Sequence, residues 1–164
     1  MEYFKQEKDY TCGCACVRMI LSHFSIDVPT EAELEKHLKT DSNGTDPAMM
    51  IKYLKRKGYE VKKGENASLS EIQSLHLDGW VVILEISVDV PHFTVYNGHN
   101  GCHLKLNDPF FGQLSRPNKK FESEKNRHPN LRWWIRTQDF GDLPYDFEGR
   151  GSHKAYIAAK KLNV

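Results

Sequence analysis

Three cysteines, Cys12, Cys14 and Cys16, lie within five residues near the start of the chain. A cysteine attacks a carbonyl as its thiolate, and the N-terminus of a helix with a nearby imidazolium favours that charged form. Over residues 12–24 the apolar residues recur at three- and four-residue spacings, which predicts a helix beginning at or just before Cys12. We therefore expect Cys12 to be a nucleophile, and Cys16, on the apolar face, to be inert core.

The base for such a nucleophile must come from elsewhere in the chain, and His92 is the strongest candidate among eight histidines. It opens a predicted strand whose hairpin partner ends in Asn107-Asp108-Pro109. With a loop at residues 98–101, His92 lies opposite Asn107, and a one-residue change in loop size places Asp108 opposite instead. Either side chain accepts the second N–H of the imidazole, so both are candidates for the group that orients His92.

The clustered cysteines have a second explanation. Together with Cys102 or His103 they are alternative ligands for zinc or an iron–sulfur cluster. The one-residue gaps argue against this, because structural zinc sites favour two to four residues between cysteines. We therefore predict no metal and no cofactor. Gly13, which allows a close approach next to the nucleophile, and Trp80 are further candidates for contacts with a substrate.

These residues also resemble a known family. The segments that carry the likeness are Gln6, six residues before Cys12; Cys12-Gly13-Cys14-Ala15-Cys16; Asn43-Gly44-Thr45-Asp46-Pro47; the strand at 80–86; His92-Phe93-Thr94-Val95; and Asn107-Asp108-Pro109. Over about residues 3–112 the chain resembles the bacteriocin-processing, double-glycine cysteine peptidases and their stand-alone relatives.

The resemblance implies a papain-like fold with four site residues. Cys12 attacks a carbonyl, His92 shuttles the proton, Asp108 holds His92, and the Gln6 side chain helps to bind the oxyanion. It implies a cysteine hydrolase that cleaves a peptide or amide bond through a thioester acyl-enzyme. The expected substrate is a peptide or protein tail with small residues near the cleavage point.

The chain departs from this family at three positions. Thr11 stands where aspartate is frequent, Cys14 where proline is usual, and Pro91 where glycine is usual. The substrate of such a diverged member need not be a double-glycine leader. Deamidation or acyl transfer by the same triad, and binding by a papain-like module without turnover, are alternative functions.

The elements that position these residues are helices first and antiparallel strands after them. Beyond residues 12–24, helices are expected after the N-cap Thr30 with its capping-box partner Glu33, from Asp46-Pro47 to Gly58, and from Ser70 to near residue 79. Strands are expected at 59–62, 80–86, 93–96, 102–106 and 155–159. We predict one α+β domain over residues 1–164, with an irregular, divergent segment at 110–153.

Composition limits the partners. The chain has 164 residues, 39% hydrophobic and 27% charged, and a net charge of +1, which provides no overall field to attract nucleic acid. Basic and aromatic residues at 116–136 are typical of a solvated face, with a single-stranded nucleic acid or an acidic protein as the alternative partner. No apolar run approaches the ~18 residues of a membrane span, and no signal peptide is evident. We expect a cytoplasmic location, with delivery as a leaderless effector as the alternative.

Overall fold

The computed structural model describes residues 1–24, 27–65, 67–88, 90–101, 103–117 and 155–162. The elements within this part of the chain are α1 (Cys12–Phe24), α2 (Glu31–Leu38), α3 (Pro47–Arg56), β1 (Tyr59–Gly64), α4 (Leu69–Leu77), β2 (Val81–Val88), β3 (Val90–Asn100), β4 (His103–Asp108), β5 (Gly112–Pro117) and β6 (Ala155–Lys161). The strands form one antiparallel sheet in the order β1-β6-β2-β3-β4-β5. The predicted α+β class is confirmed.

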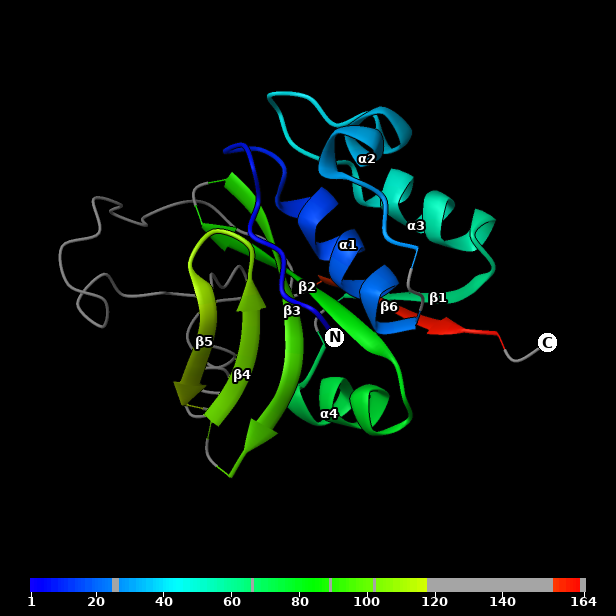
Figure 1. Ribbon diagram of the computed structural model, residues 1–164. Coiled ribbons are helices and arrows are strands. Elements are labelled where there is room, and N and C mark those ends of the chain that lie inside the picture. The colour runs from blue at the N-terminus through cyan, green and yellow to red at the C-terminus, as the bar shows by residue number, and fades with distance from the viewer. Residues whose placement is uncertain (25–26, 66, 89, 102, 118–154, 163–164) are drawn as a thin grey trace, which may run out of the picture.

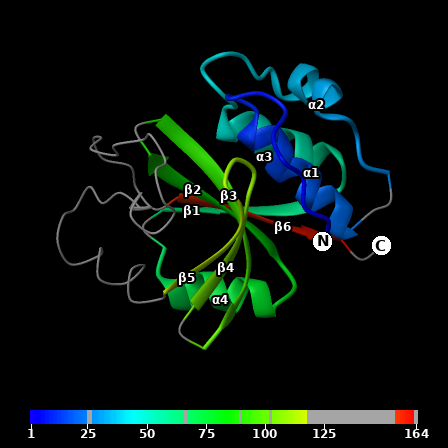
Figure 2. The same cartoon turned by 60° about the vertical axis from the view of Figure 1, so that its left-hand side comes forward.

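Helices cover both faces of the sheet. The helices α1, α2 and α3 lie on one face and α4 lies on the other, as Figures 1 and 2 show. Alternate residues of β2 separate the two cores, since successive side chains of a strand point to opposite faces. Val81 and Ile83 pack with the first three helices, while Val82 and Leu84 pack with α4.

Local signals in the sequence set most helix starts. Thr30 and Glu33 form the predicted capping box of α2, and Asp46 accepts from the Ala48 N–H at the start of α3. For α4 the predicted start at Ser70 is wrong, because Ser68 is the N-cap and its Oγ accepts from the Glu71 N–H at 3.1 Å. A start at Ser68 brings Leu69 into the helix, where it lies on the same buried face as Ile72 and Leu75.

The hairpin of β3 and β4 is shifted from its predicted register. β3 continues through the predicted loop to Asn100, and its pairing with β4 is irregular between Tyr96 and His99. The prediction that Asn107 lies opposite His92 is therefore wrong, because Asn107 pairs with Val95. The main cause is the position of the turn, because β3 runs to Asn100, which pairs with His103, where the sequence predicted a loop over residues 98–101. The irregularity between Tyr96 and His99 changes the register by one further residue.

The prediction of an irregular segment over residues 110–153 is wrong for its first residues. Residues Gly112–Pro117 form β5, which pairs with β4 at the edge of the sheet. Leu114 is buried while Gln113 and Ser115 are exposed, so this edge strand has a single clear apolar position and a weak periodic signal. Residues 118–154 lie outside the described part, as do Cys102 and most of the basic and aromatic stretch at 116–136.

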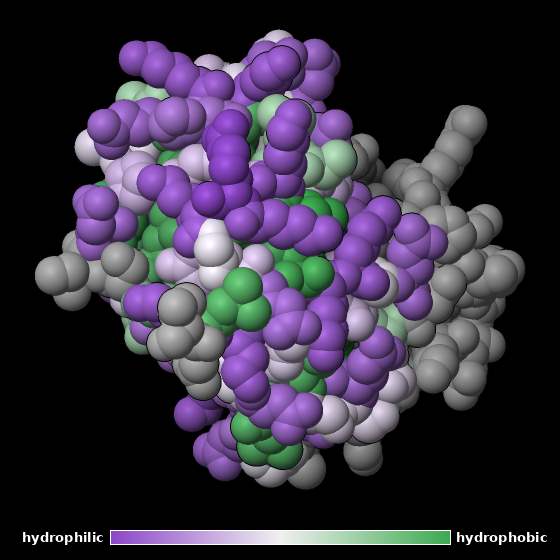
Figure 3. Space-filling view, turned by 90° about the vertical axis from the view of Figure 1, so that its right-hand side faces the viewer, coloured by the Kyte–Doolittle hydropathy of each residue, from purple (hydrophilic) through white to green (hydrophobic). Residues whose placement is uncertain are grey.

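The outer surface is mainly polar on the side that lies to the right in Figure 1. Figure 3 shows this side, with apolar residues in patches between hydrophilic ones. The amphipathic helices thus direct their apolar faces inward to the sheet. Among the described residues there is no helix of the length and apolar character required to cross a membrane.

Candidate active site

The thiol of Cys12 lies at the N-terminus of α1. The first backbone N–H groups of a helix have no acceptor within the helix, and they give this end a partial positive charge. The Ala15 N–H donates to the Thr11 carbonyl at 3.0 Å, which anchors the first turn around the thiol. Cys12 retains 5% exposure, whereas Cys14 and Cys16 are completely buried. The sequence therefore correctly separated the helix-end cysteine from the core cysteine.

The imidazole of His92 contacts the carboxylate of Asp108. His92 Nε2 lies 3.0 Å from Oδ1 and 3.0 Å from Oδ2, and both residues are buried. His92 lies on β3, and Asp108 is the last residue of β4. Asn107 pairs with Val95, so the same register places Asp108 opposite Thr94, two residues from His92. The contact between His92 and Asp108 is therefore diagonal across the two strands, a separation that long side chains can span.

Opposing effects set the pKa of His92. Burial lowers it, but hydrogen bonds with the Asp108 carboxylate and the Cys12 thiol, together with the charges of both groups, raise it more, to about 10. Because Nε2 faces Asp108, Nδ1 is the ring nitrogen that remains for the thiol. With its pKa raised to about 10, the imidazole is charged at neutral pH.

Asp108 is held from several sides. Its Oδ1 accepts from the backbone N–H groups of Phe110 at 2.9 Å and Phe111 at 3.0 Å. Asp108 thus also begins a turn, as its place before proline allows. The Tyr3 hydroxyl donates to the Asp108 backbone carbonyl at 3.1 Å. These bonds fix the carboxylate in the orientation that meets His92.

Gln6 lies beside the same turn. Its backbone N–H donates to the Pro109 carbonyl at 3.1 Å, and its side-chain Nε2 donates to the Lys8 carbonyl at 2.8 Å. One N–H of the amide remains for another acceptor. The Gln6 side chain is buried, and its Oε1 has no hydrogen-bond partner among the described residues. The segment from Gln6 to Thr11 therefore joins the turn after Asp108 to the start of α1.

Asn107, the other sequence candidate for the orienting group, points elsewhere. Its buried Oδ1 accepts from Asn97 Nδ2 and from Gln113 Nε2, each at 3.3 Å. The side chain therefore links β4 to both neighbouring strands. The structure brings Asp108, and not Asn107, to His92.

The other two cysteines of the cluster lie in different surroundings. Cys14 Sγ is 3.3 Å from Thr40 Oγ1, and burial raises the pKa of this thiol to about 11. Burial raises the pKa of Cys16 well above its usual range. Both thiols therefore stay protonated at neutral pH. In the described part of the chain, no three His, Cys, Asp or Glu residues are grouped as metal ligands.

Gly13 allows a close approach, but the approaching group belongs to the protein. A Cβ at this position would lie 2.6 Å from Thr45 Cβ and 2.7 Å from Thr45 Oγ1. The residues just before α3 thus pack directly on the first turn of α1. Gly13 is explained by this packing, and its role in substrate contacts stays a prediction.

Trp80 is not brought near these groups. It is buried just before β2, with the Lys62 ammonium 4.2 Å from its ring centroid, and it lines a shallow depression at that end of the sheet. On β2 the residue that pairs with His92 is Ile86, six positions further along. At about 3.3 Å per residue this corresponds to roughly 20 Å. Substrate contact by Trp80 has no support in this arrangement.

The structure adds two buried polar groups that sequence reasoning missed. Thr11 and Glu31 are both fully buried and hydrogen-bonded to each other next to the Gln6 segment. Thr11 carried no periodic signal. Glu31, however, shares a helix face with Leu34 and Leu38 at spacings of three and seven, which places a carboxylate on the buried side of α2.

A thiol at a helix N-terminus, an imidazole on a strand and a buried carboxylate on the next strand lie on a papain-like scaffold. Solved structures show the same fold. The chain is similar to the peptidase domain of Streptococcus ComA, a bi-functional ABC transporter involved in quorum sensing, with a TM-score of 0.71, 16% identity and 98% coverage of both chains. It is also similar to a double glycine motif protease from an AMS/PCAT transporter in complex with the leader peptide, at TM-score 0.68 and 16% identity, over 98% of this chain and 91% of that one.

A putative C39-like peptidase from Bacillus anthracis is similar at TM-score 0.61 and 15% identity, over 99% of this chain and 96% of that one. The sequence model of the peptidase C39 family matches residues 1–125, well over half of the chain. The protein therefore belongs to the peptidase C39 family, and this membership supports a cysteine protease function. No curated protein sequence matches it significantly.

Proposed function

We propose that the protein is a cysteine protease in which Cys12 is the nucleophile, His92 the general base and acid, and Asp108 the orienting group. Gln6 and the backbone N–H of Cys12 bind the oxyanion. One observation carries the proposal: the buried imidazole of His92 contacts a buried carboxylate through Nε2, while the Cys12 thiol, at a helix N-terminus, helps to raise the pKa of His92. This is the arrangement that nucleophilic catalysis by a thiol requires.

The reaction proceeds through a thioester. The Cys12 thiolate attacks the carbonyl carbon of the cleaved bond, forming a C–S bond and moving the carbonyl electrons onto the oxygen. The tetrahedral intermediate collapses, the C–N bond breaks, and His92 gives its proton to the leaving amine. Water then attacks the thioester while His92 accepts its proton, and the carboxylic acid leaves as the Cys12 thiolate is restored.

The electrostatics support this order of events. The raised pKa of His92, about 10, keeps the imidazole charged at neutral pH and available as a proton donor to the leaving amine. Asp108 stabilises that charge and is itself fixed by backbone donors. A single oxyanion donor typically lowers the barrier by about 3–4 kcal/mol, so the second N–H of Gln6 has a large expected effect.

The proposed substrate is a peptide or protein tail with small residues next to the cleaved bond. The nucleophile is only 5% exposed, so bulky side chains beside the scissile carbonyl would meet the walls around it. One similar solved protease is described in complex with a leader peptide, which supports a peptide as the substrate here.

The test begins without a substrate. We expect iodoacetamide to label Cys12 faster than Cys14 or Cys16 near pH 6, as measured by peptide mass mapping. His92→Ala should slow labelling of Cys12 at least about tenfold, because the charged imidazole that favours the thiolate is lost. The two buried cysteines are internal controls in the same molecule.

Cleavage is tested next, with fluorogenic peptide amides that end in Gly-Gly, Gly-Ala or Ala-Gly, and with Cys12→Ala as the control. Turnover by the wild type and none by Cys12→Ala supports the proposal. Equal, slow labelling of all three cysteines, or cleavage that survives in Cys12→Ala, would overturn it.

A further inference from the structure

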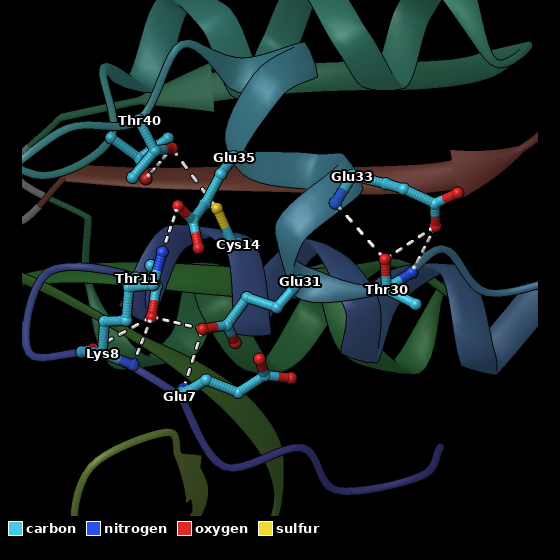
Figure 4. Close-up of polar contacts among 10 residues, drawn as sticks. Glu7, Lys8, Thr11, Cys14, Thr30, Glu31, Glu33, Glu35 and Thr40 are labelled. Carbon is cyan, nitrogen blue, oxygen red and sulfur yellow. Dashed lines mark hydrogen bonds and ion pairs between the residues drawn. The ribbon is translucent and has the colours of Figure 1, made fainter.

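A carboxylate buried behind the Gln6 segment has no part in the reaction described above. Glu31, the first residue of α2, is completely buried. Its Oε1 accepts from the Glu7 backbone N–H at 2.7 Å and from the Thr11 hydroxyl. Figure 4 shows the Glu31 side chain reaching from the helix to both groups. An acidic side chain in the interior thus bonds two points of the segment that precedes Cys12.

The bonded segment leads directly to Gln6. The Thr11 hydroxyl accepts from the Lys8 N–H at 3.1 Å, and the Lys8 carbonyl accepts from the Thr11 N–H at 3.2 Å. The same Lys8 carbonyl accepts from Gln6 Nε2 at 2.8 Å. A continuous path of hydrogen bonds therefore runs from Glu31 through Thr11 and Lys8 to the Gln6 amide. The position of that amide depends on the conformation in which the path holds Lys8.

Burial of this carboxylate has an electrostatic cost that the segment offsets. Burial raises the pKa of Glu31, while the bonds from Thr11 and from the Glu7 N–H, and the charge of Arg18, act in the opposite direction. Its second oxygen, Oε2, has no hydrogen-bond partner among the described residues. A simple surface helix has no need for such a group. The bonds that Glu31 does make all go to the segment between Gln6 and Cys12.

Two neighbouring glutamates of the same helix differ in their contacts. Glu33 closes the capping box with Thr30 at the exposed side of α2 and is bonded to no residue of the segment. Glu35 reaches the segment only through an ion pair with the exposed Lys8 ammonium at 2.7 Å. Glu33 is therefore a matched control, because its loss weakens the same helix without touching the segment.

We propose that Glu31 is a positioning residue for the oxyanion donor: it holds the segment from Gln6 to Thr11 so that the Gln6 amide faces the reacting carbonyl. The inference rests on the proposed function, since it assigns Glu31 to the same reaction. Glu31 does not contact the thiol or the imidazole, so it acts on catalysis only through Gln6.

The test is a double-mutant cycle between Glu31→Ala and Gln6→Ala, measured as cleavage of a Gly-Gly peptide amide. We expect Glu31→Ala to lower kcat about 10- to 100-fold with little change in KM, because an oxyanion donor acts mainly in the transition state. In the Gln6→Ala background, Glu31→Ala should cost less than about twofold more. Iodoacetamide labelling of Cys12, which needs no oxyanion donor, should stay within about twofold of the wild type.

Two further variants separate positioning from folding. Glu31→Gln keeps an acceptor oxygen for the Glu7 and Thr11 donors and should retain kcat to within a few-fold. Thr11→Val removes the bond from the other partner without removing the buried glutamate and should reproduce the loss of kcat. Glu33→Ala should keep wild-type kcat, and circular dichroism checks that every variant is folded.

Effects of Glu31→Ala and Gln6→Ala that multiply would overturn the inference, as would equal kcat losses in Glu31→Ala and Glu33→Ala. If Glu31→Ala does not fold, the cycle between Thr11→Val and Gln6→Ala decides by the same criterion. The proposed function fails separately, when Cys12→Ala still cleaves or the wild type cleaves none of the peptides. In that case the inference fails with it.

Discussion

Two imidazoles on opposite faces of the sheet carry opposite shifts in pKa. Asp108 and Cys12 raise the pKa of His92 to about 10, although burial alone would lower it. His76, in α4 on the other face, is partly buried against the Tyr96 ring, at 5.1 Å between ring centroids. Burial and the nearby His99 lower the pKa of His76.

The difference lies in the neighbours. His76 Nδ1 is buried with no hydrogen-bond partner in the described part of the chain. A backbone hydrogen bond with Trp80 raises the pKa of His76, but less than burial and His99 lower it. His92 has a carboxylate on Nε2, and this carboxylate and the Cys12 thiol both raise its pKa. Burial therefore does not by itself make a histidine catalytic. The buried anion keeps the imidazole charged and oriented.

The strongest way to break this contrast is Asp108→Asn. The asparagine keeps the shape and one acceptor oxygen for the Phe110 and Phe111 N–H groups, but it removes the negative charge beside His92. We expect peptide cleavage to fall about a thousandfold or more, and the pKa of His92 to move down toward the behaviour of His76. NMR titration of the imidazole protons measures the second effect, with Asn107→Ala as the neighbouring control. A pKa that stays near 10 would contradict the assigned role of Asp108.

The pH dependence of stability sharpens the contrast further. The folded state raises the pKa of His92 from about 6.5 to about 10, so the stabilisation is complete below pH 6.5 and is lost as the pH rises toward 10. We expect urea unfolding to show a loss of a few kcal/mol across this window, at about 1.4 kcal/mol per pKa unit. His92→Ala should remove this slope, while the exposed His103→Ala should keep it. Parallel curves for wild type and His92→Ala would refute the ion pair.

The smallest expected effect is at the other imidazole. His99 contributes to the low pKa of His76 and lies at the exposed end of β3. His99→Glu replaces this like charge with an opposite one, so the pKa of His76 should rise, by less than one unit because solvent screens an exposed pair. NMR titration of His76 measures the shift. An unchanged or lower value would mean that burial alone sets the pKa of His76.

Sequence patterns were sufficient where the physical cause is local. The periodicity of α1 placed Cys12 at a helix start, and capping residues such as Thr30 and Asp46 fixed the starts of α2 and α3. The resemblance to double-glycine peptidases supplied Gln6 and favoured Asp108. The described structure brings Asp108 to His92 and ties Gln6 to the turn that follows.

What the sequence did not predict depends on longer-range geometry. The register of β3 and β4 differs because β3 continues to Asn100 through a stretch whose residue types predict a loop, and because the irregularity between Tyr96 and His99 cannot be recognised from alternation alone. The edge strand β5 was missed because it buries one side chain, Leu114. Glu31 was not singled out from the sequence, although its spacing to Leu34 and Leu38 places it on the buried face of α2. There the spacing of the residues indicated burial, whereas the charged residue type is typical of an exposed position.

The contacts of Asp108 also make the state of the site observable. The same carboxylate oxygen that meets His92 also accepts from the Phe110 and Phe111 amides. Slow hydrogen exchange at these two amides therefore requires the turn to be closed, with Oδ1 in its place beside His92. The exchange rates of these two amide protons, measured by NMR, therefore report whether the catalytic centre is assembled in the absence of substrate.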